Sequence, residues 1–594
     1  MKIQKLKIIF GSQTGIAYSL SEQLYNVFKL FESEVPIDFG SGNDLCDSIN
    51  EPCLIIFISS TTGHGHAPTN FLDLWNRIMK RTCPTNTGLT QFFVIGLGDS
   101  NYLKYNFTAK ILFRRLVQLN FQPFHANGLC LIDESLPGGA NMQFNHISIK
   151  LLEKLQSLNV LAGDEVKIKN IFSIEIMEKI SKYKVEISPN LEVNDELYDA
   201  AYLKILCTLN ERITSVDHFQ ETRLISLKLP KGTAYKPGDV LNVLSKNSTS
   251  DVQAFYDLTN LESVKSTKVG FRNHVQTLDW YINYYFDLSS CPDQSFFIRL
   301  AQLHKMETVD LDEVERERLS TEYFRLLELG DVTNEDNIDD YFDYVTRSKR
   351  KLIEILIDLP ISTRLITLHN IFNLFPGPIK SRQYSICNWK SDEIQLIVAI
   401  VDYRTRMKDN RLGLCSNYLK NIQEEDLVHC NIESSSLFLD YSRHLVANPR
   451  PCILIAPGTC IASHRSFIKY QMAHKYLPEV RNLLIFGCRN ELDDYYFKEE
   501  WSEMTDVLEV IPAFSRSKDH EKKYVQDIVM KEKNRIWSLI NESEASILIV
   551  ANNKNMASDI TKVFEEIFEQ FSSLKRTQMT VLERSGRFQI EAWS

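Results

Sequence analysis

The feature that most constrains this chain is a pair of segments near its middle, Arg382–Ser385 and Gly413–Leu419. The first reads as a short strand, and we expect Arg382, Tyr384 and Ser385 to share one of its faces. Arginine can donate two hydrogen bonds to a phosphate, tyrosine can stack against a ring, and a serine hydroxyl can contact a reacting atom. The second segment reads as a glycine turn that opens a helix and offers backbone N–H groups to a pyrophosphate.

Taken alone, the first segment could equally be a buried strand with a satisfied arginine. The second segment and the motifs on either side favour a binding site instead. Together they predict a ligand that carries phosphate and a flat ring.

Length and composition describe a soluble protein of several domains. A chain of 594 residues is too long for one hydrophobic core. It contains no run of about 18 apolar residues, and its start leads directly into a strand-like segment, so we expect no membrane anchor. Twelve cysteines without any C-x-x-C pair favour reduced thiols and a cytoplasmic location.

The net charge of −10 is unevenly distributed. Residues 1–160 carry 13 Lys and Arg against 12 Asp and Glu, whereas residues 302–343 carry 14 acidic and 4 basic side chains. A solvated helical face is the simplest interpretation of the acidic stretch. Nothing in the charge pattern indicates binding to nucleic acid.

The first 160 residues alternate apolar runs with helical patterns. Lys5–Phe10, Cys53–Ser59 and Phe92–Leu97 read as buried parallel strands, and Ile16–Leu30 and Thr108–Leu119 as amphipathic helices. Each strand ends in a loop rich in small polar residues. Ligands of open α/β sheets bind at those ends.

The first loop, residues 11–17, has the composition of a phosphate cradle. Ser12 and Thr14 can donate hydroxyl groups, and the helix that follows can donate N–H groups. The loop has no lysine, which argues against a nucleoside triphosphate and for a phosphate monoester.

Two further loops, residues 60–68 and 96–102, supply glycines where backbone must approach a ring. Any one such loop is weak evidence, but three in this order are strong. His64 and His66 provide at most half of a metal site, and we expect no metal.

The C-terminal part returns to an α/β pattern, with strands expected at Cys452–Ala456, Leu483–Gly487 and Ser546–Ala551. Between the second and third of these strands lie five residues that together suit a dianionic phosphate: Ser515, Arg516, Lys522, Tyr524 and Gln526. The tyrosine is also available to stack on adenine. The alternative is ordinary charge pairing on a surface helix.

In this order, the motifs resemble the diflavin reductase family along nearly the whole chain. The resemblance implies a flavodoxin-like FMN domain (1–160), a linker (161–195), an FAD domain (196–445) and a Rossmann-like NADPH domain (446–594). The FAD domain would be a β-barrel of the ferredoxin–NADP reductase type, interrupted at about 255–370 by a helical insertion. The fold class is therefore α/β plus β-barrel.

The resemblance also assigns the binding residues. The FMN ligands would be Ser12, Gln13, Thr14, Gly15, Ile16, Thr61, Thr62, Gly63, Gly65, Leu97, Gly98, Asp99, Asn106 and Tyr102, the last stacked on the ring. Those for FAD would be Arg382, Tyr384, Ser385, Gly413, Leu414, Cys415 and Ser416. NADPH would lie on Gly458, Thr459, Ser515, Arg516, Lys522, Tyr524, Gln526, Asp559 and Trp593.

For the reaction, the resemblance implies hydride transfer from NADPH to FAD beside Ser385. Asp559 would orient the serine and the nicotinamide, and Trp593 would cover the flavin until it swings aside. Electrons would then pass singly through FMN to an anamorsin-type iron–sulfur protein, in cytosolic iron–sulfur protein assembly. We expect a monomer apart from this acceptor.

Two departures from the family pattern concern the nicotinamide side. Cys460 replaces a glycine of the pyrophosphate loop, and Val550 stands where many members have cysteine. Two alternatives therefore stay open. One is a reductase for another one-electron acceptor, such as a haem protein. The other is a flavin-containing scaffold with little turnover.

Overall fold

The computed structural model divides the chain into two compact units. One comprises residues 1–195, 247–379 and 405–408, and the other comprises 196–246, 380–404 and 409–594. The described residues are 3–13, 15–33, 35–62, 65–100, 104–124, 128–136, 139–162, 169–180, 183, 185–194, 202–272, 274–306, 312–375, 378–390, 392–434, 449–517, 521–551, 554–572 and 576–592. Across these residues, no helix combines the length and apolarity that crossing a membrane requires.

The N-terminal sheet is parallel, in the order β3-β1-β4-β5, with β6 and β7 both pairing with β5. Its strands are β1 (Leu6–Gly11), β3 (Ile37–Ser41), β4 (Leu54–Ser60), β5 (Gln91–Gly98), β6 (Gln122–Pro123) and β7 (Leu129–Asp133). Apolar side chains at consecutive positions let both faces of this sheet be buried. The three strands expected from the sequence are confirmed.

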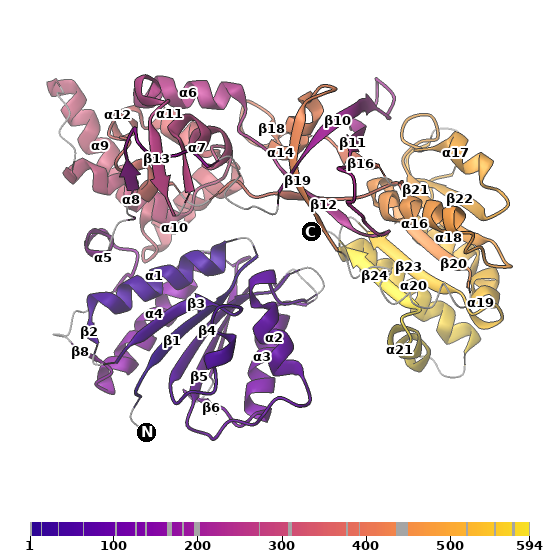
Figure 1. Ribbon diagram of the computed structural model, residues 1–594, viewed down its shortest axis with the longest axis horizontal. Helices are drawn as coiled ribbons and strands as arrows, with labels where there is room; N and C mark the ends of the chain where they lie inside the picture. The colour runs from indigo at the N-terminus through magenta and orange to yellow at the C-terminus, as the bar shows by residue number, and fades with distance from the viewer. Residues whose placement is uncertain are drawn as a thin grey trace. The chain divides into compact units, whose positions relative to one another are not determined.

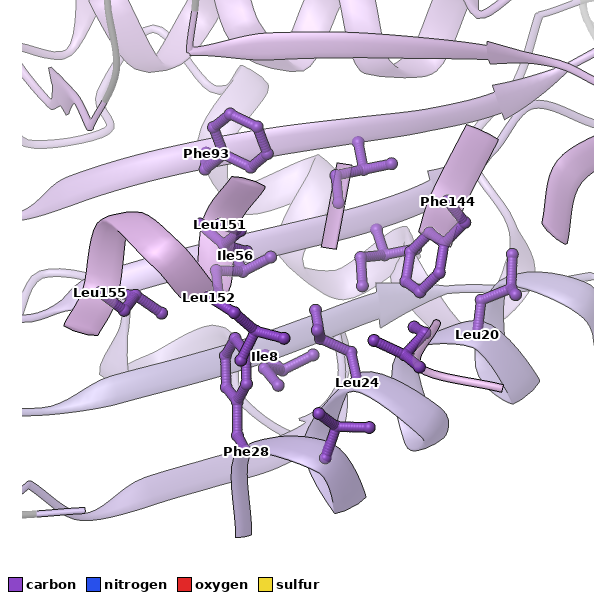
Figure 2. Packing of buried hydrophobic residues seen from close by; sticks show 14 of the residues in the cluster. Ile8, Leu20, Leu24, Phe28, Ile56, Phe93, Phe144, Leu151, Leu152 and Leu155 are labelled. Atoms are coloured by element: carbon purple, nitrogen blue, oxygen red, sulfur yellow. The ribbon is translucent and has the colours of Figure 1, made fainter. Parts of the chain in front are cut away.

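Helices cover both faces of that sheet (Figure 1). Helices α1 (Ile16–Leu30) and α4 (Gly139–Ser157) pack on one face, and α2 (Leu72–Met79) and α3 (Phe107–Gln118) on the other. Figure 2 shows the first of these two cores, where Leu24 and Phe28 meet Leu152 beside strand residue Ile8. The result is the doubly wound architecture expected for this part.

The segment expected to be a linker contributes to this core. Ile171, Phe172 and Ile176, the last on α5 (Ile174–Lys179), are buried in the same cluster as α1 and α4. Gln23 Nε2 donates to Ile171 O at 2.6 Å. Two short strands, β2 (Glu32–Ser33) and β8 (Leu161–Ala162), also pair. The interpretation of 161–195 as only a connection is therefore wrong for its first half.

A mainly helical insertion follows strand β12 (Val240–Leu244), and belongs with the N-terminal unit. Its helices are α6 (Thr249–Thr259), α7 (Leu278–Tyr284), α8 (Gln294–Met306), α9 (Glu313–Gly330), α10 (Glu335–Tyr341), α11 (Leu352–Asp358), α12 (Pro360–Arg364) and α13 (Ile371–Leu374). Strands β13 (Lys268–Phe271) and β14 (His274–Thr277) form a hairpin that pairs with β9 (Val185–Ile187).

The second unit begins with a six-stranded antiparallel sheet in the order β15-β12-β19-β10-β11-β16. The strands are β10 (Leu203–Arg212), β11 (Thr222–Lys228), β12 (Val240–Leu244), β15 (Arg382–Ser385), β16 (Glu393–Ala399) and β19 (Leu427–Glu433). A bridge between Ile386 and Leu396 joins the two ends of the sheet, which closes it into a barrel. Beside it lie β17 (Asp402–Tyr403), β18 (Arg411–Leu412) and α14 (Leu414–Asn421).

The C-terminal sheet is parallel throughout, in the order β22-β21-β20-β23-β24. The strands are β20 (Cys452–Pro457), β21 (Asn482–Cys488), β22 (Leu508–Phe514), β23 (Ser546–Ala551) and β24 (Phe588–Ala592). The helices are α16 (Ile461–His474), α17 (Lys498–Glu503), α18 (Val525–Lys531), α19 (Lys533–Asn541), α20 (Lys554–Phe571) and α21 (Arg576–Arg584). The core under α16 also contains Leu224, Cys387 and Ile397 of the barrel, so barrel and sheet share one apolar cluster.

Candidate functional site: three cofactor-binding loops and a nucleotide cleft

The loop between β1 and α1 has the geometry of a phosphate cradle. Gly15 takes a left-handed conformation (φ 92°) just before the helix, and its N–H donates to Ser12 Oγ at 3.0 Å. Ser12 N donates in turn to Asn70 Oδ1 at 2.9 Å. The first turn of α1 carries no acidic residue. Its N–H groups therefore suit an anion such as the phosphate of FMN.

The second loop, after β4, is tied to its neighbours by short hydrogen bonds. Gln13 Oε1 accepts from the N–H and the hydroxyl of Thr69, each at 2.9 Å. Thr61 Oγ1 accepts from Thr108 N at 3.2 Å, and Thr62 N donates to His66 O at 2.9 Å.

Gly65 takes a left-handed conformation, with a φ of 96°. A Cβ there would lie 2.8 Å from Lys104 Cδ and from a ring carbon of Phe107, so any larger residue would collide with them. The expected ligands Thr14, Gly63 and Tyr102 lie outside the described residues.

The third loop leaves β5 at Gly98, and Asn106 packs directly beneath it. Asn106 is left-handed (φ 52°), its Nδ2 donates to Ile132 O at 2.9 Å, and its Oδ1 is buried without a partner in the described residues. Leu97 is buried in the core, so only its backbone can face a ligand. Asp99 begins the loop, as expected.

On the barrel, β15 pairs with β12, which places Val243 opposite Arg382 and Leu241 opposite Tyr384. Because side chains alternate along a strand, Arg382 and Tyr384 lie on one face and Ser385 on the other. The expectation that all three share a face is therefore wrong.

Tyr384 and Cys415 lie together on the barrel. Burial raises the pKa of Tyr384, and the neighbouring Cys415 thiol raises it further. Burial likewise raises the pKa of Cys415 to about 11. The structure thus brings the two halves of the expected FAD site, β15 and α14, into contact.

The turn before α14 requires glycine. A Cβ on Gly413 would lie 2.7 Å from Val401 Cβ and 2.8 Å from Ser416 Oγ. Ser416 Oγ accepts from Val401 N at 3.1 Å and donates to Gly413 O at 3.3 Å, which fixes the turn. The first turn of α14 has no acidic residue, so the N–H groups of Leu414 and its neighbours suit the FAD pyrophosphate.

A cleft of about 270 Å³ lies between the barrel and the C-terminal sheet. Expected ligands in its wall are Gly458, Thr459, Ser515, Tyr524 and Gln526. Gly458 takes a left-handed conformation (φ 55°) with nothing within 4 Å of a Cβ position. Gln526 Oε1 is buried and has no partner in the described residues, so a ligand in the cleft could donate to it.

Several cationic side chains and one aromatic ring lie in or beside the wall of this cleft. Lys522 Nζ lies 5.0 Å from the centre of the Tyr524 ring, and Ser515 Oγ donates to Cys488 O at 3.3 Å. Arg516 and Lys522 stand beside the lining residues, whereas Lys523 and Arg489 are part of the lining. Arg489, which the sequence analysis missed, follows β21, a strand end where ligands of α/β sheets bind.

The two departures from the family pattern are accommodated. Cys460 has right-handed backbone angles (φ −61°, ψ −15°), which any residue adopts, and its side chain is buried in the core. The glycine-dependent position of the loop is Gly458. Val550 is buried in the same core.

The Asp559 carboxylate is 52% exposed on α20 and lies 3.1 Å from Lys562 Nζ. A second carboxylate, that of Glu591, lies close enough to Cys460 of the glycine loop to act on its thiol, and Glu591 pairs with Val550 across β23 and β24. Burial raises the pKa of the Cys460 thiol to about 12, and the charge of Glu591 adds to this effect.

The only sequence signal for Glu591 is its position two residues before Trp593, and this spacing alone does not predict a functional role. Trp593 itself lies outside the described residues.

Comparison with protein families gives the same three domains in the same order. A flavodoxin model matches residues 8–157, an FAD-binding domain model matches 210–418, and an oxidoreductase NAD-binding domain model matches 454–562. The expected FMN, FAD and nicotinamide-dinucleotide domains are thereby confirmed.

Whole-length relatives agree with the domain matches. The chain is 28% identical to the NADPH-dependent diflavin oxidoreductase 1 of Schizosaccharomyces pombe and to that of Bos taurus, over 100% of both chains in each case. It is 29% identical to the protein of the same name from Dictyostelium discoideum, over 94% of this chain and 89% of that one. The chain is an oxidoreductase, and over its whole length it is similar to the diflavin oxidoreductases.

Proposed function

We propose that this protein carries electrons from NADPH through FAD and FMN to an anamorsin-type iron–sulfur protein in the cytosol. The cleft between barrel and C-terminal sheet carries the proposal, because its cationic end suits the 2′-phosphate that distinguishes NADPH from NADH. We assign the FMN-binding loops to residues 1–160, in a domain whose core extends through residues 171–176, FAD to 196–445 and NADPH to 446–594.

Each cofactor has its own anchoring groups in this proposal. The N–H groups of α1 and α14 hold the phosphates of FMN and FAD, and the exposed Arg382 adds a cation on the FAD side. The flavins supply the conversion of two-electron to one-electron transfer, which no side chain performs. Ser385 and Glu591 are the hydroxyl and the carboxylate that we assign to the nicotinamide side, with Trp593 as the cover of the flavin.

The surroundings of the FMN loops support an acceptor other than a basic cytochrome. Beside Gly65 lie Lys104 and Phe107, with Lys104 Nζ 5.3 Å from the Phe107 ring centre, and Ile16 is 40% exposed. A basic partner would favour an acidic docking face. All twelve cysteines are free, which supports a reducing compartment.

The first experiment is anaerobic titration of the full chain with NADPH and with NADH, followed by flavin absorbance. We expect bleaching at much lower NADPH than NADH concentrations. Arg516→Ala should raise the NADPH requirement about 10- to 100-fold, because one charge-assisted bond contributes about 1.5–3 kcal/mol, and should leave NADH use unchanged. Lys531→Ala, which removes a cation at the far end of α18, is the control.

Two results would refute parts of the proposal. A coloured protein that neither nucleotide bleaches would be the flavin scaffold with little turnover. A bleached protein that reduces cytochrome c but not an anamorsin-type [2Fe–2S] protein would refute the acceptor alone.

A further inference from the structure

The loop between β10 and β11 of the barrel reaches the nucleotide cleft. Ser215 N donates to Asp493 O at 3.1 Å, and Ser215 Oγ donates to Asp493 Oδ1 at 2.6 Å. Arg212 stiffens the loop from inside, donating to Ser215 O at 2.6 Å and His218 O at 2.9 Å. A barrel loop is thus held against the loop that follows β21.

Phe219 of this barrel loop lies close to two arginines at the cleft. Its ring centre is 4.4 Å from the guanidinium carbon of Arg489 and 5.7 Å from that of Arg516. His218 Nε2 lies 3.5 Å from Arg489 Nη1 and adds a polar contact. Arg489 lines the cleft, and Arg516 follows the lining residue Ser515.

Burial does not explain this phenylalanine, because its side chain is 68% exposed. Neither guanidinium has a carboxylate within 4.0 Å in the part of the chain that the structure describes. The two guanidinium groups are each attracted to the ring but repel each other. The doubly charged 2′-phosphate of NADPH would offset this repulsion, whereas the neutral 2′-hydroxyl of NADH would not.

We propose that Phe219 is a positioning residue that holds Arg489 and Arg516 ready for the 2′-phosphate of NADPH. This inference rests on the proposed function and extends it, since it makes the choice of NADPH over NADH a joint property of the barrel and the C-terminal sheet. The ring restricts the rotamers of both arginines, so less ordering remains to be done when the phosphate binds.

The test is calorimetric titration of the full flavin-loaded chain with 2′,5′-ADP and with 5′-AMP, which differ only in the 2′-phosphate. Phe219→Leu should weaken binding of 2′,5′-ADP about 5- to 100-fold, because the two arginines must then be ordered on binding at about 0.5–1.5 kcal/mol each, and should leave 5′-AMP binding unchanged. Phe219→Tyr keeps the ring faces and should restore the wild-type ratio of affinities.

Val216→Ala is the matched control, since Val216 lies on the same loop and is 84% exposed. It should not change the ratio. If Phe219→Leu weakens both ligands equally, the ring serves adenosine or the loop fold, and the inference fails. If wild type prefers 2′,5′-ADP and the variant keeps that preference, the role of Phe219 is refuted and the NADPH assignment stands. If wild type binds both ligands equally, the NADPH assignment fails as well.

Discussion

Two arginines join one domain to the next in this chain, and their surroundings differ sharply. Arg465 of α16 is 5% exposed and connects the C-terminal sheet to the barrel. Its Nε and Nη2 donate to the two oxygens of Glu500 at 2.9 and 2.7 Å, and its Nη1 donates to Cys387 O at 2.9 Å and Gln395 Oε1 at 3.0 Å. Every face of this guanidinium is used within one packed core.

Arg272, in contrast, is 40% exposed and joins the insertion to α1 of the FMN domain. Its guanidinium carbon lies 4.6 Å from the ring centre of Tyr183 and 5.8 Å from that of Tyr18. The hydroxyls of Tyr18 and Tyr183 both donate to the Glu22 carboxylate. Arg272 itself is left-handed (φ 49°), an uncommon conformation for a residue with a side chain.

The difference indicates which junction can open. Separating Arg465 from its partners would strand a charge in an apolar core, whereas Arg272 and its tyrosines can be rehydrated at modest cost. The nucleotide domain is therefore fixed on the FAD barrel, where hydride transfer needs constant geometry. The FMN domain meets the insertion partly through Arg272, a contact that water can replace, and partly through Val332, which is buried in the FMN-domain core. The replaceable part suits a domain that must also meet an acceptor.

The largest expected effect concerns where the separable FMN domain ends. A fragment of residues 1–180 should fold and hold FMN, and a fragment of residues 1–160 should not. The shorter one loses the buried side chains of Leu161, Ile171, Phe172 and Ile176. At about 1.5–3 kcal/mol each, their loss is comparable to the whole stability of a typical domain.

Circular dichroism and FMN fluorescence quenching of both fragments are the measurements. Equal stability of the two would show that the FMN domain ends at residue 160 and that the packed linker belongs to the junction instead.

The next largest effect should come from Arg465→Met. Removing one partner of a buried ion pair costs about 3–5 kcal/mol, since Glu500 is left charged and desolvated beside Lys469 alone. We expect a lower unfolding temperature for the second unit by calorimetry and loss of NADPH-driven flavin reduction. Arg481→Met, which removes a half-exposed arginine paired with Glu509, is the control. A loss no greater than that of the control would mean that the two junctions do not differ in kind.

Arg272→Ala should have a smaller effect than Arg465→Met, and it should raise turnover where Arg465→Met lowers it. It removes the cation–π contacts with Tyr18 and Tyr183 at a partly exposed site, about 1–2 kcal/mol, and so favours the separated FMN domain. Stopped-flow reduction of an iron–sulfur acceptor should become faster, while reduction of FAD by NADPH stays unchanged. Lys265→Ala, an exposed cation of the same insertion, serves as the control. A slower acceptor reduction would identify the contact as a requirement for transfer between the flavins.

Much of this organisation could be predicted from the sequence, because it depends on local patterns. Gly413 follows from its turn pattern, and Gly15 and Gly458 follow from the family resemblance. Gly15 and Gly458 are left-handed, and a Cβ on Gly413 would collide with Val401. Alternating strand and helix patterns were sufficient for the α/β domains. The error at Ser385 was one of counting along a strand, where a shift of one residue changes the face.

What the sequence did not reveal depends on contacts between distant segments. Phe219 and Arg489 meet across two domains, and no local pattern joins them. Ile171 and Phe172 look like linker residues until α1 and α4 are placed beside them. Likewise, only the structure shows that the Asp559 carboxylate on α20 is 52% exposed.

The smallest expected effect tests whether the FMN domain orders its own loops without help from a neighbour. Asp133 Oδ1 accepts from Ser100 N at 2.9 Å and from the N–H and hydroxyl of Ser135 at 3.1 and 2.7 Å, which holds the third loop. Burial alone would raise the pKa of Asp133, but these hydrogen bonds bring it down to about 2. A lowered folded-state pKa means that the charged carboxylate stabilises the fold above its ordinary pKa of 3.8. That contribution is lost as the pH falls from there through about 2.

Asp133→Asn should weaken FMN binding a few-fold at pH 7, by about 1 kcal/mol, since a neutral acceptor replaces a charged one. FMN release, followed by fluorescence between pH 7 and pH 3, should show the gap between variant and wild type closing only below about pH 4. A gap that closes near pH 6 would assign the effect to another group, and no gap at any pH would show that the loop is held from outside the domain.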